Sequence, residues 1–201
     1  MSTAHYFSSD PEGPFERRRI SAALNGAEVA VSTSGGIFSP DGLDKGTAVL
    51  LKHVPDPSPE GELLDIGCGW GPIALTMAQR SPDARVWAVD INARSRTLCA
   101  ENAASLGLSN VIAAAPEEVP TDLRFSTIWS NPPIRVGKAA LHDILLSWLP
   151  RLDADAEAWL VVQKNLGADS LQKWLAASLP AEHSVDRPET DKGFRLLRVR
   201  R

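Results

Sequence analysis

The stretch Glu62-Leu63-Leu64-Asp65-Ile66-Gly67-Cys68-Gly69-Trp70-Gly71-Pro72-Ile73 decides the fold. It predicts a short apolar strand, a turn with glycine at alternate positions, and the start of a helix. Glycine lets a backbone bend sharply and approach a ligand without intervening side chains. A dinucleotide site would need the spacing G-x-G-x-x-G, but here Gly71 comes one residue early and Pro72 takes its place. The turn is therefore either a simple strand-to-helix connection or part of the binding site of a different nucleotide-like cofactor.

A second apolar strand, Arg85–Val89, ends at the carboxylate of Asp90, with Ile91 beside it. In nucleoside-binding α/β folds, an acid at this strand tip accepts hydrogen bonds from the ribose hydroxyls. Asp90 could instead cap the next helix, a role that Asn92 and Ser95 also suit. Because Asp90 follows the glycine turn at the expected distance, we favour the ligand role.

The composition is that of a globular protein, with 43% hydrophobic and 23% charged residues among 201. No apolar run is long enough to span a membrane, and Met1 to Asp10 lack the pattern of a secretory signal. Two cysteines make no disulfide framework and fit a reducing cytoplasm, so we expect a cytoplasmic protein. The histidines are scattered without metal-ligand spacing, and we expect no metal.

The net charge of −4 argues against a globally basic nucleic-acid binder. Two local basic clusters survive this average: Arg17-Arg18-Arg19 near the start, and Arg195, Arg198, Arg200 and Arg201 at the end. Each cluster is either solvated surface or a contact for a polyanion.

Beyond residue 60, strand and helix patterns alternate at the spacing of βαβ units. The expected strands are 63–66, 85–89, 110–114, 125–130 and 157–163, and the expected helices are 72–80, 93–106, 138–149 and 168–178. This alternation predicts an α/β fold with a doubly wound, mostly parallel sheet covered by helices on both faces. Residues 183–186 and 193–199 predict an antiparallel hairpin at the sheet edge, with a turn over 187–192.

Residues 1–59 are expected to form a small N-terminal extension of the same domain, with the main fold over 60–201. Within the extension, residues 28–33 alternate as a strand, Gly35-Gly36 predicts a turn, and Ile37-Phe38 begins a return strand. A helix is expected from about Asp44 to His53. Capping is the favoured role of Asp44, and contact with a bound cofactor is the alternative.

The strand 125–130 runs directly into Asn131-Pro132-Pro133-Ile134. Two prolines fix an extended bend and remove two amide donors, so the carbonyls there are expected to face a pocket without competing backbone donors. Asn131 adds a side-chain acceptor. This motif is turn chemistry wherever it falls. At the carboxyl end of a strand in a doubly wound sheet, however, it stands where ligands bind.

Together, Asp65–Gly71, Asp90 and Asn131–Ile134 resemble class I S-adenosylmethionine-dependent methyltransferases that act on nitrogen. The upstream segments Gly36–Ser39 and Leu43–Thr47 and the closing segment Lys192–Leu197 are similar to the methyltransferase small domain family, which includes ribosomal RNA small-subunit methyltransferase C. The likeness covers roughly residues 15–201. It implies a Rossmann-like class I methyltransferase fold, S-adenosylmethionine as cofactor and transfer to guanine N2 of ribosomal RNA.

The resemblance also implies roles for single residues. Asn131 with Pro132 and Pro133 would hold the target amino group as the catalytic element. The expected cofactor-binding residues are Asp65, Gly67, Gly69, Gly71, Asp90, Ile91 and Asn131, and the expected substrate-binding residues are Phe38, Asn131, Ile134 and Lys138. Two features depart from the family. Ala114-Ala115-Pro116 stands where an acid usually meets the adenine, and the chain lacks room for the second domain copy of the bacterial enzyme.

Two other functions remain open at this point. Protein-glutamine or small-molecule N-methyltransferases use the same Asn-Pro-Pro element, although the glutamine enzymes usually continue with Tyr where this chain has Ile134. A non-catalytic RNA-binding module of the same fold is the alternative from a different class. The presence of Asp65, Asp90 and Asn131 argues against it.

Overall fold

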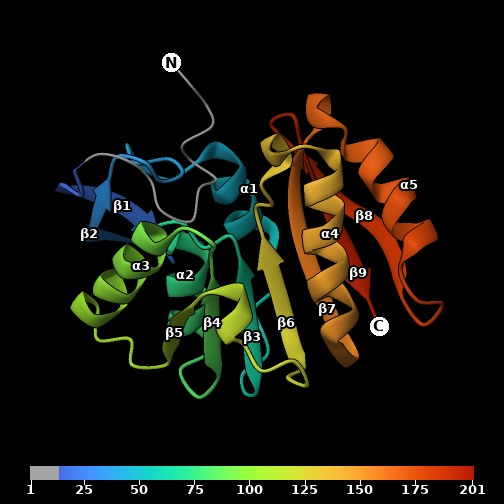
Figure 1. The fold of residues 1–201 in the computed structure, drawn as a ribbon, viewed down its shortest axis with the longest axis horizontal. Helices are drawn as coiled ribbons and strands as arrows, with labels where there is room; N and C mark the ends of the chain where they lie inside the picture. Colours follow the sequence, from blue (N-terminus) through green and yellow to red (C-terminus); the bar gives the residue numbers. More distant parts are fainter. Residues whose placement is uncertain (1–13) are drawn as a thin grey trace.

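The computed structural model describes residues 14–201. Met1 to Asp10, for which no secretory signal was expected, lie outside the described residues. The main sheet has the strand order β5-β4-β3-β6-β7-β9-β8 (Figure 1). Its strands are β3 (Glu62–Ile66), β4 (Arg85–Val89), β5 (Val111–Ala114), β6 (Phe125–Ser130), β7 (Leu152–Gln163), β8 (Ser184–Asp191) and β9 (Phe194–Arg200). The first five strands in this order are parallel, and β9 is antiparallel to β7 and β8, which confirms the predicted fold class.

Five helices surround this sheet: α1 (Lys45–His53), α2 (Pro72–Arg80), α3 (Ala93–Ser105), α4 (Lys138–Trp148) and α5 (Ala168–Ser178). Consecutive strand residues alternate between two cores, as the pleat of a buried strand requires. Leu64 lies in the core under α4 and α5, whereas Leu63 lies in the core under α1 and α2. Both faces of the sheet are therefore covered, as the alternating pattern predicted.

The chain direction across the sheet reverses at β3. From β3 it moves outward through β4 to β5, and then returns to place β6 on the other side of β3. Ligands of doubly wound sheets bind beyond the carboxyl ends of the strands at such a reversal. Ile66 pairs with Ser130 at this point, so the segments after β3 and β6 leave the sheet side by side.

The predicted N-terminal hairpin is wrong in its pairing. Strand β2 (Ala27–Ser34) pairs with β1 (Arg17–Leu24), and Gly35-Gly36 leads into an irregular segment instead of a return strand. The turn is Asn25-Gly26, where both residues have positive φ. Asn-Gly is the preferred pair for a two-residue hairpin turn of this kind, and its twist matches that of the flanking strands. This local preference outweighs the flexibility of the two glycines.

The C-terminal hairpin is present, but its turn is shorter than predicted. Strand β8 continues through Arg187 and Pro188 to Asp191, with an irregular register between Asp186 and Glu189, and the turn is Lys192-Gly193. Because β8 is an edge strand, Pro188 removes no hydrogen bond from the interior of the sheet. The proline therefore produces a local irregularity and does not end the strand.

Within residues 14–201, no helix is long and apolar enough to cross a membrane. The same part of the chain contains no group of three or more His, Cys, Asp or Glu side chains placed to hold a metal ion.

Asn102 on α3 ties the N-terminal hairpin to the main fold. Its buried amide accepts from the Ser32 N–H at 2.7 Å and donates to the carbonyls of Ser32 and Trp70, each at 2.9 Å. One side chain thus joins β2, α3 and the glycine turn after β3.

We predict that Asn102→Ala lowers the free energy of unfolding by about 1–3 kcal/mol, because buried backbone groups lose their partners. Chemical denaturation measures this, with exposed Asn165→Ala as the matched control. Equal stability of the two variants would contradict the bridging role of Asn102.

Candidate active site

A pocket lies at the carboxyl ends of β3 and β6. Its lining combines the glycine turn, the start of α2, the segment before α1, and Asn131. The lining residues are Phe38, Ser39, Asp44, Thr47, Gly67, Cys68, Gly69, Trp70, Pro72, Ile73 and Asn131. The two motifs that the sequence singled out are thus brought together, and residues upstream of the main fold complete the pocket.

The glycine turn has a backbone that side chains would obstruct. Gly67, Gly69 and Gly71 all have positive φ, at 78°, 56° and 102°. A Cβ on Gly67 would meet no described atom within 4 Å, so glycine leaves the space above the turn open. A Cβ on Gly71 would lie 2.8 Å from Cys99 Sγ, so this glycine allows α2 and α3 to pack closely.

Asp65 lies under the turn and is fully buried. Its Oδ2 accepts from the Ala74 N–H at 3.0 Å, while Oδ1 has no partner within residues 14–201. Burial raises the pKa of Asp65 well above its usual range, and the Ala74 hydrogen bond opposes this only in part. A cationic or hydrogen-bond-donating ligand would satisfy this oxygen and stabilise the charged carboxylate.

Asp90 at the tip of β4 does not cap α3. Its Oδ2 accepts from the Gly69 N–H at 3.0 Å and its Oδ1 from the Asn92 N–H at 2.9 Å. The helix cap is Asn92, whose side chain accepts from the N–H groups of Arg94 and Ser95. Burial raises the pKa of Asp90. Asp90 therefore supports the glycine turn and stands next to exposed Ile91, and its role as a ligand contact stays a prediction.

Asn131 is held by two residues of the segment that begins α1. Its Nδ2 donates to Asp44 Oδ2 at 2.9 Å and to Thr47 Oγ1 at 3.0 Å. Both amide hydrogens are therefore engaged, and Oδ1 is the polar atom that remains for a ligand. Asp44 also caps α1, as predicted, by accepting from the N–H groups of Gly46 and Thr47.

The prediction that the proline carbonyls lack competing backbone donors is wrong. The Ile134 N–H donates to the Pro132 carbonyl at 2.8 Å, and the Val136 N–H donates to that of Pro133 at 3.1 Å. Pro133, with φ −76° and ψ 74°, is the centre of an inverse γ-turn that a short helical turn over Ile134–Val136 continues. A carbonyl oxygen has two lone pairs, so each can still accept a second hydrogen bond.

Besides Asn131, Phe38 is the predicted substrate-binding residue that belongs to the lining of this pocket, whereas Ile134 and Lys138 lie outside it. Phe38 lines it and is 39% exposed, with its Cβ 4.0 Å from the position of a Cβ on Gly69. Ile134 packs partly against the core under α4, and exposed Lys138 begins α4. After β5, the Glu118 carboxylate accepts a hydrogen bond from the Ala115 N–H at 2.6 Å, so this acid stabilises the turn in which it lies.

Sequence reasoning favoured a capping role for Asp44 over a contact with the cofactor, and it did not identify Thr47 as a site residue. An Asp three residues before a Thr is typical of any capped helix N-terminus, so the local sequence gives no sign that these residues belong to the site. The contact with Asn131 joins positions more than 80 residues apart, which no local pattern reveals.

Comparison with known proteins places the chain among methyltransferases. The profile of the methyltransferase small domain family matches residues 28–198. An uncharacterized protein of Bacillus subtilis, YbxB, is 34% identical over 98% of both chains. Ribosomal RNA small subunit methyltransferase C of Shewanella amazonensis is 35% identical over 63% of this chain and 36% of its own length.

A solved structure shares the fold. It is a T. thermophilus 16S rRNA N2 methyltransferase in complex with AdoMet and guanosine, with a TM-score of 0.79 and 23% identity over 95% of this chain and 52% of that protein. This chain thus spans about half the length of that protein and about a third of the Shewanella relative. The findings confirm, at the level of the family, the predicted class of S-adenosylmethionine-dependent methyltransferase. The chain belongs to the methyltransferase small domain family.

Proposed function

We propose that this chain transfers a methyl group from S-adenosylmethionine to the exocyclic N2 amino group of a guanine in ribosomal RNA. One observation carries the proposal. The Asn131 amide has both hydrogens engaged, so that Oδ1 is left to accept a hydrogen bond beside the glycine turn. Methyl transfer to an amino nitrogen requires an oriented hydrogen-bond acceptor next to the cofactor-binding site.

The residues around the turn fit the cofactor. The unpartnered, buried Oδ1 of Asp65 suits a bound ammonium group, and the open space at Gly67 admits a ligand against the backbone. Asp90, at the tip of the neighbouring strand, suits a pair of ribose hydroxyls. When bound, S-adenosylmethionine supplies a methyl group on a positively charged sulfur, which is already a strong electrophile.

The protein's own contribution is alignment and electrostatics. The lone pair of an exocyclic amine is delocalised into the base, and it becomes available as positive charge builds on nitrogen. Asn131 Oδ1 and the second lone pair of the Pro132 carbonyl can each accept one N–H hydrogen and stabilise this charge. Holding the reacting atoms at roughly 3–3.5 Å supplies the rest of the rate. The proton then leaves to water.

The pocket margin suits a flat base. Phe38 is partly exposed above the glycine turn and can stack on an aromatic ring. The T. thermophilus neighbour was solved with guanosine, which supports guanine as the target. Ile134 replaces the tyrosine expected of a protein-glutamine enzyme, which makes that substrate the weaker candidate.

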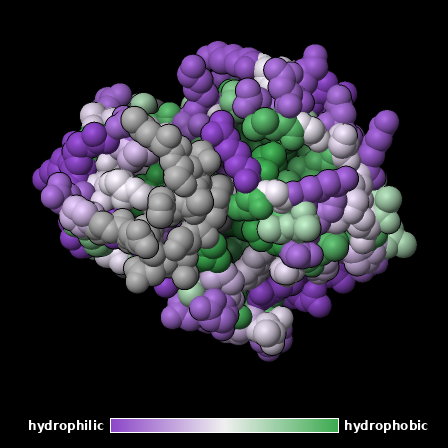
Figure 2. Space-filling model, turned by 45° about the horizontal axis from the view of Figure 1, so that its top comes forward, coloured by the Kyte–Doolittle hydropathy of each residue, from purple (hydrophilic) through white to green (hydrophobic). Residues whose placement is uncertain are grey.

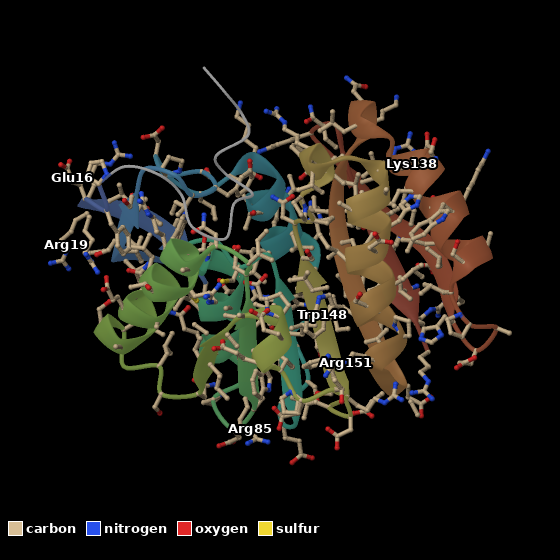
Figure 3. All side chains as sticks on the ribbon, viewed as in Figure 1. Glu16, Arg19, Arg85, Lys138, Trp148 and Arg151 are labelled. Atoms are coloured by element: carbon tan, nitrogen blue, oxygen red, sulfur yellow. The ribbon has the colours of Figure 1, made fainter. Side chains whose placement is uncertain are left out.

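Unpaired cations surround the same edge of the sheet, which supports an RNA substrate. They lie after β6 and β7, in the β8–β9 turn, or at the start of α1, and all are exposed. Within the described part of the chain, none of them has a carboxylate within ion-pair distance: Lys45, Arg135, Lys138, Lys164 and Lys192. Figure 3 shows Lys138 at this edge and Arg85 at the opposite one.

The two basic clusters that stand out in the sequence are largely neutralised. Arg17 pairs with Glu101, and Arg18 pairs with Asp41. In the C-terminal cluster, Arg195 pairs with Asp169, while Arg198 and Arg200 both pair with Asp186. The five unpaired cations therefore remain available at the carboxyl ends of the parallel strands, on the side that Figure 2 turns toward the viewer, where hydrophobic residues are bordered by hydrophilic ones.

We predict that affinity for S-adenosylmethionine rises from pH 5 to pH 7. Burial raises the pKa of Asp65 and Asp90 in the free protein, and a bound donor favours the charged carboxylates, so binding releases protons. Calorimetry should show a shallower rise in Asp65→Asn, with Asp90 supplying the remainder. Exposed Asp83→Asn is the control and should follow the wild type. Affinity that falls over this range would contradict the cofactor role of both acids.

We predict that Asn131→Ala slows methyl transfer by about 10²–10³-fold, the usual cost of losing an oriented electrostatic partner at a reacting centre. Affinity for S-adenosylmethionine should stay near that of the wild type. Single-turnover methylation of small-subunit ribosomal RNA, followed by mass spectrometry of its nucleosides, measures the rate and identifies the product. Equal rates per folded molecule would show that Asn131 has only a structural role in the turn. A product other than N2-methylguanosine would overturn the proposed target.

We predict that the combined variant Arg135→Gln, Lys138→Gln and Lys164→Gln binds RNA with a weaker dependence on salt. Removing one cation that binds a phosphate lowers the slope of log K against log salt by about 0.7 for single strands. Fluorescence titration of protein-free small-subunit ribosomal RNA at several salt concentrations gives the slope. Arg85→Gln, at the opposite edge and paired with Glu62, is the control for a cation away from the pocket, and an equal slope in both variants would place the RNA elsewhere.

A further inference from the structure

We infer that Asp44 and Thr47 are positioning residues that fix the orientation of the Asn131 amide for methyl transfer. This inference rests on the proposed function, because it concerns the acceptor that would hold the target amino group. It assigns a chemical role to the segment Leu43-Asp44-Lys45-Gly46-Thr47, which precedes the main fold.

The amide of asparagine must face one way to work in this site. The two ends of the amide have nearly the same shape, but only Oδ1 can accept a hydrogen bond from an amine. Nδ2 is a donor, so it cannot form a hydrogen bond with the N–H groups of the amine. Asp44 decides between these orientations, since a carboxylate can only accept. Asp44 Oδ2 lies 2.9 Å from Asn131 Nδ2, and Thr47 Oγ1 takes the second hydrogen at 3.0 Å.

Asp44 is itself rigidly held. The same Oδ2 accepts from the Gly46 N–H at 2.7 Å and from the Thr47 N–H at 3.1 Å, so three N–H groups converge on one oxygen. A negative charge at a helix N-terminus is favoured by the helix dipole. The carboxylate is thus fixed by the first turn of α1 before it contacts Asn131.

Gly46 and Phe194 complete this arrangement. A Cβ on Gly46 would lie 2.9 Å from Asp44 Oδ2 and 3.0 Å from Phe194 Cε1, closer than carbon atoms normally approach. Glycine therefore lets Phe194, at the start of β9, press against the cap of α1. Thr47 is 2% exposed, so its hydroxyl is also held in a packed environment.

The charge on Asp44 does more than set orientation. A hydrogen bond from a neutral amide to a carboxylate is stronger than one between neutral groups, and it polarises the amide. Polarisation increases the negative charge on Oδ1, the atom that would accept from the amine. Asp44 should therefore favour the build-up of positive charge on the reacting nitrogen by acting through Asn131.

Matched substitutions separate this role from simple support of the fold. Thr47→Val removes the hydroxyl acceptor and keeps the shape, whereas Thr47→Ser keeps the acceptor. Asp44→Ser still caps α1 but is too short to reach Asn131, whereas Asp44→Asn can keep both the cap and the contact. We expect kcat to fall about 10–100-fold in Thr47→Val and Asp44→Ser, the usual effect of losing a group that orients a functional residue.

The conservative variant Thr47→Ser should recover most of the rate. Asp44→Asn can keep the cap and the contact but lacks the charge, so its rate should lie between those of Asp44→Ser and the wild type. All four variants should bind S-adenosylmethionine as the wild type does. An unchanged kcat per folded molecule in both disruptive variants would overturn the inference and leave the proposed function standing. A selective loss of cofactor affinity would also overturn it, because these residues would then contact the cofactor.

A second measurement does not depend on activity. In nitrogen-15 spectra of the cofactor-bound protein, the side-chain amide signals missing from Asn131→Ala identify Asn131. Their hydrogens should exchange with water faster in Thr47→Val and Asp44→Ser than in the conservative variants. Equal exchange in all four would overturn the inference. A wild type that shows this protection but methylates no RNA would instead overturn the proposed function.

Discussion

The pairing of β3 with β6 is the constraint on which the site depends. These strands come from opposite halves of the sheet, and the match of Ile66 with Ser130 brings their carboxyl ends to one place. The Ser130 hydroxyl adds a 2.7 Å hydrogen bond to the Ile66 carbonyl, which fixes the last residue of each strand against the other. A glycine turn and an Asn-Pro-Pro bend can then face each other without either being long or flexible.

Two carboxylates beside this pairing, the buried Asp65 and the partly buried Asp90, lower the stability of the fold. Burial raises the pKa of both Asp65 and Asp90, so at neutral pH each carboxylate is held where its charge is poorly solvated. Groups with raised folded pKa values stabilise the fold at low pH and lose that contribution as pH rises through the folded pKa. A stable apolar core would avoid such groups. Their presence at two strand tips next to an open turn makes sense when a positively charged, hydroxyl-bearing ligand compensates them.

The main sheet and the outline of the site could be predicted because their signals are local. Alternating strand and helix patterns specify which residues are buried, and the strand ends then bring Gly67–Gly71, Asp90 and Asn131 to one edge. The Gly35-Gly36 turn signal did not predict the N-terminal pairing. The competing Asn25-Gly26 turn connects β2 to β1, and the arginines of β1 made that segment look like charged surface and not like a strand. The carbonyl of Pro132 was misjudged for a related reason. Prolines remove their own donors, but they do not prevent the next N–H from folding back.

The least predictable part of the site lies before the main fold and determines how the site can act. Strand ends place Asn131, but nothing in the parallel sheet distinguishes its oxygen from its nitrogen. That distinction comes from α1, whose first turn presents an acceptor-only carboxylate to Nδ2. The helix is in turn held by Phe194 from β9, which is at the other end of the chain. Under the proposed function, the core of the fold supplies the cofactor site and the Asn131 amide, while the flanking segments decide which atom of that amide the substrate meets. Sequence changes in those segments would then alter the preference for an amino substrate without disturbing the sheet.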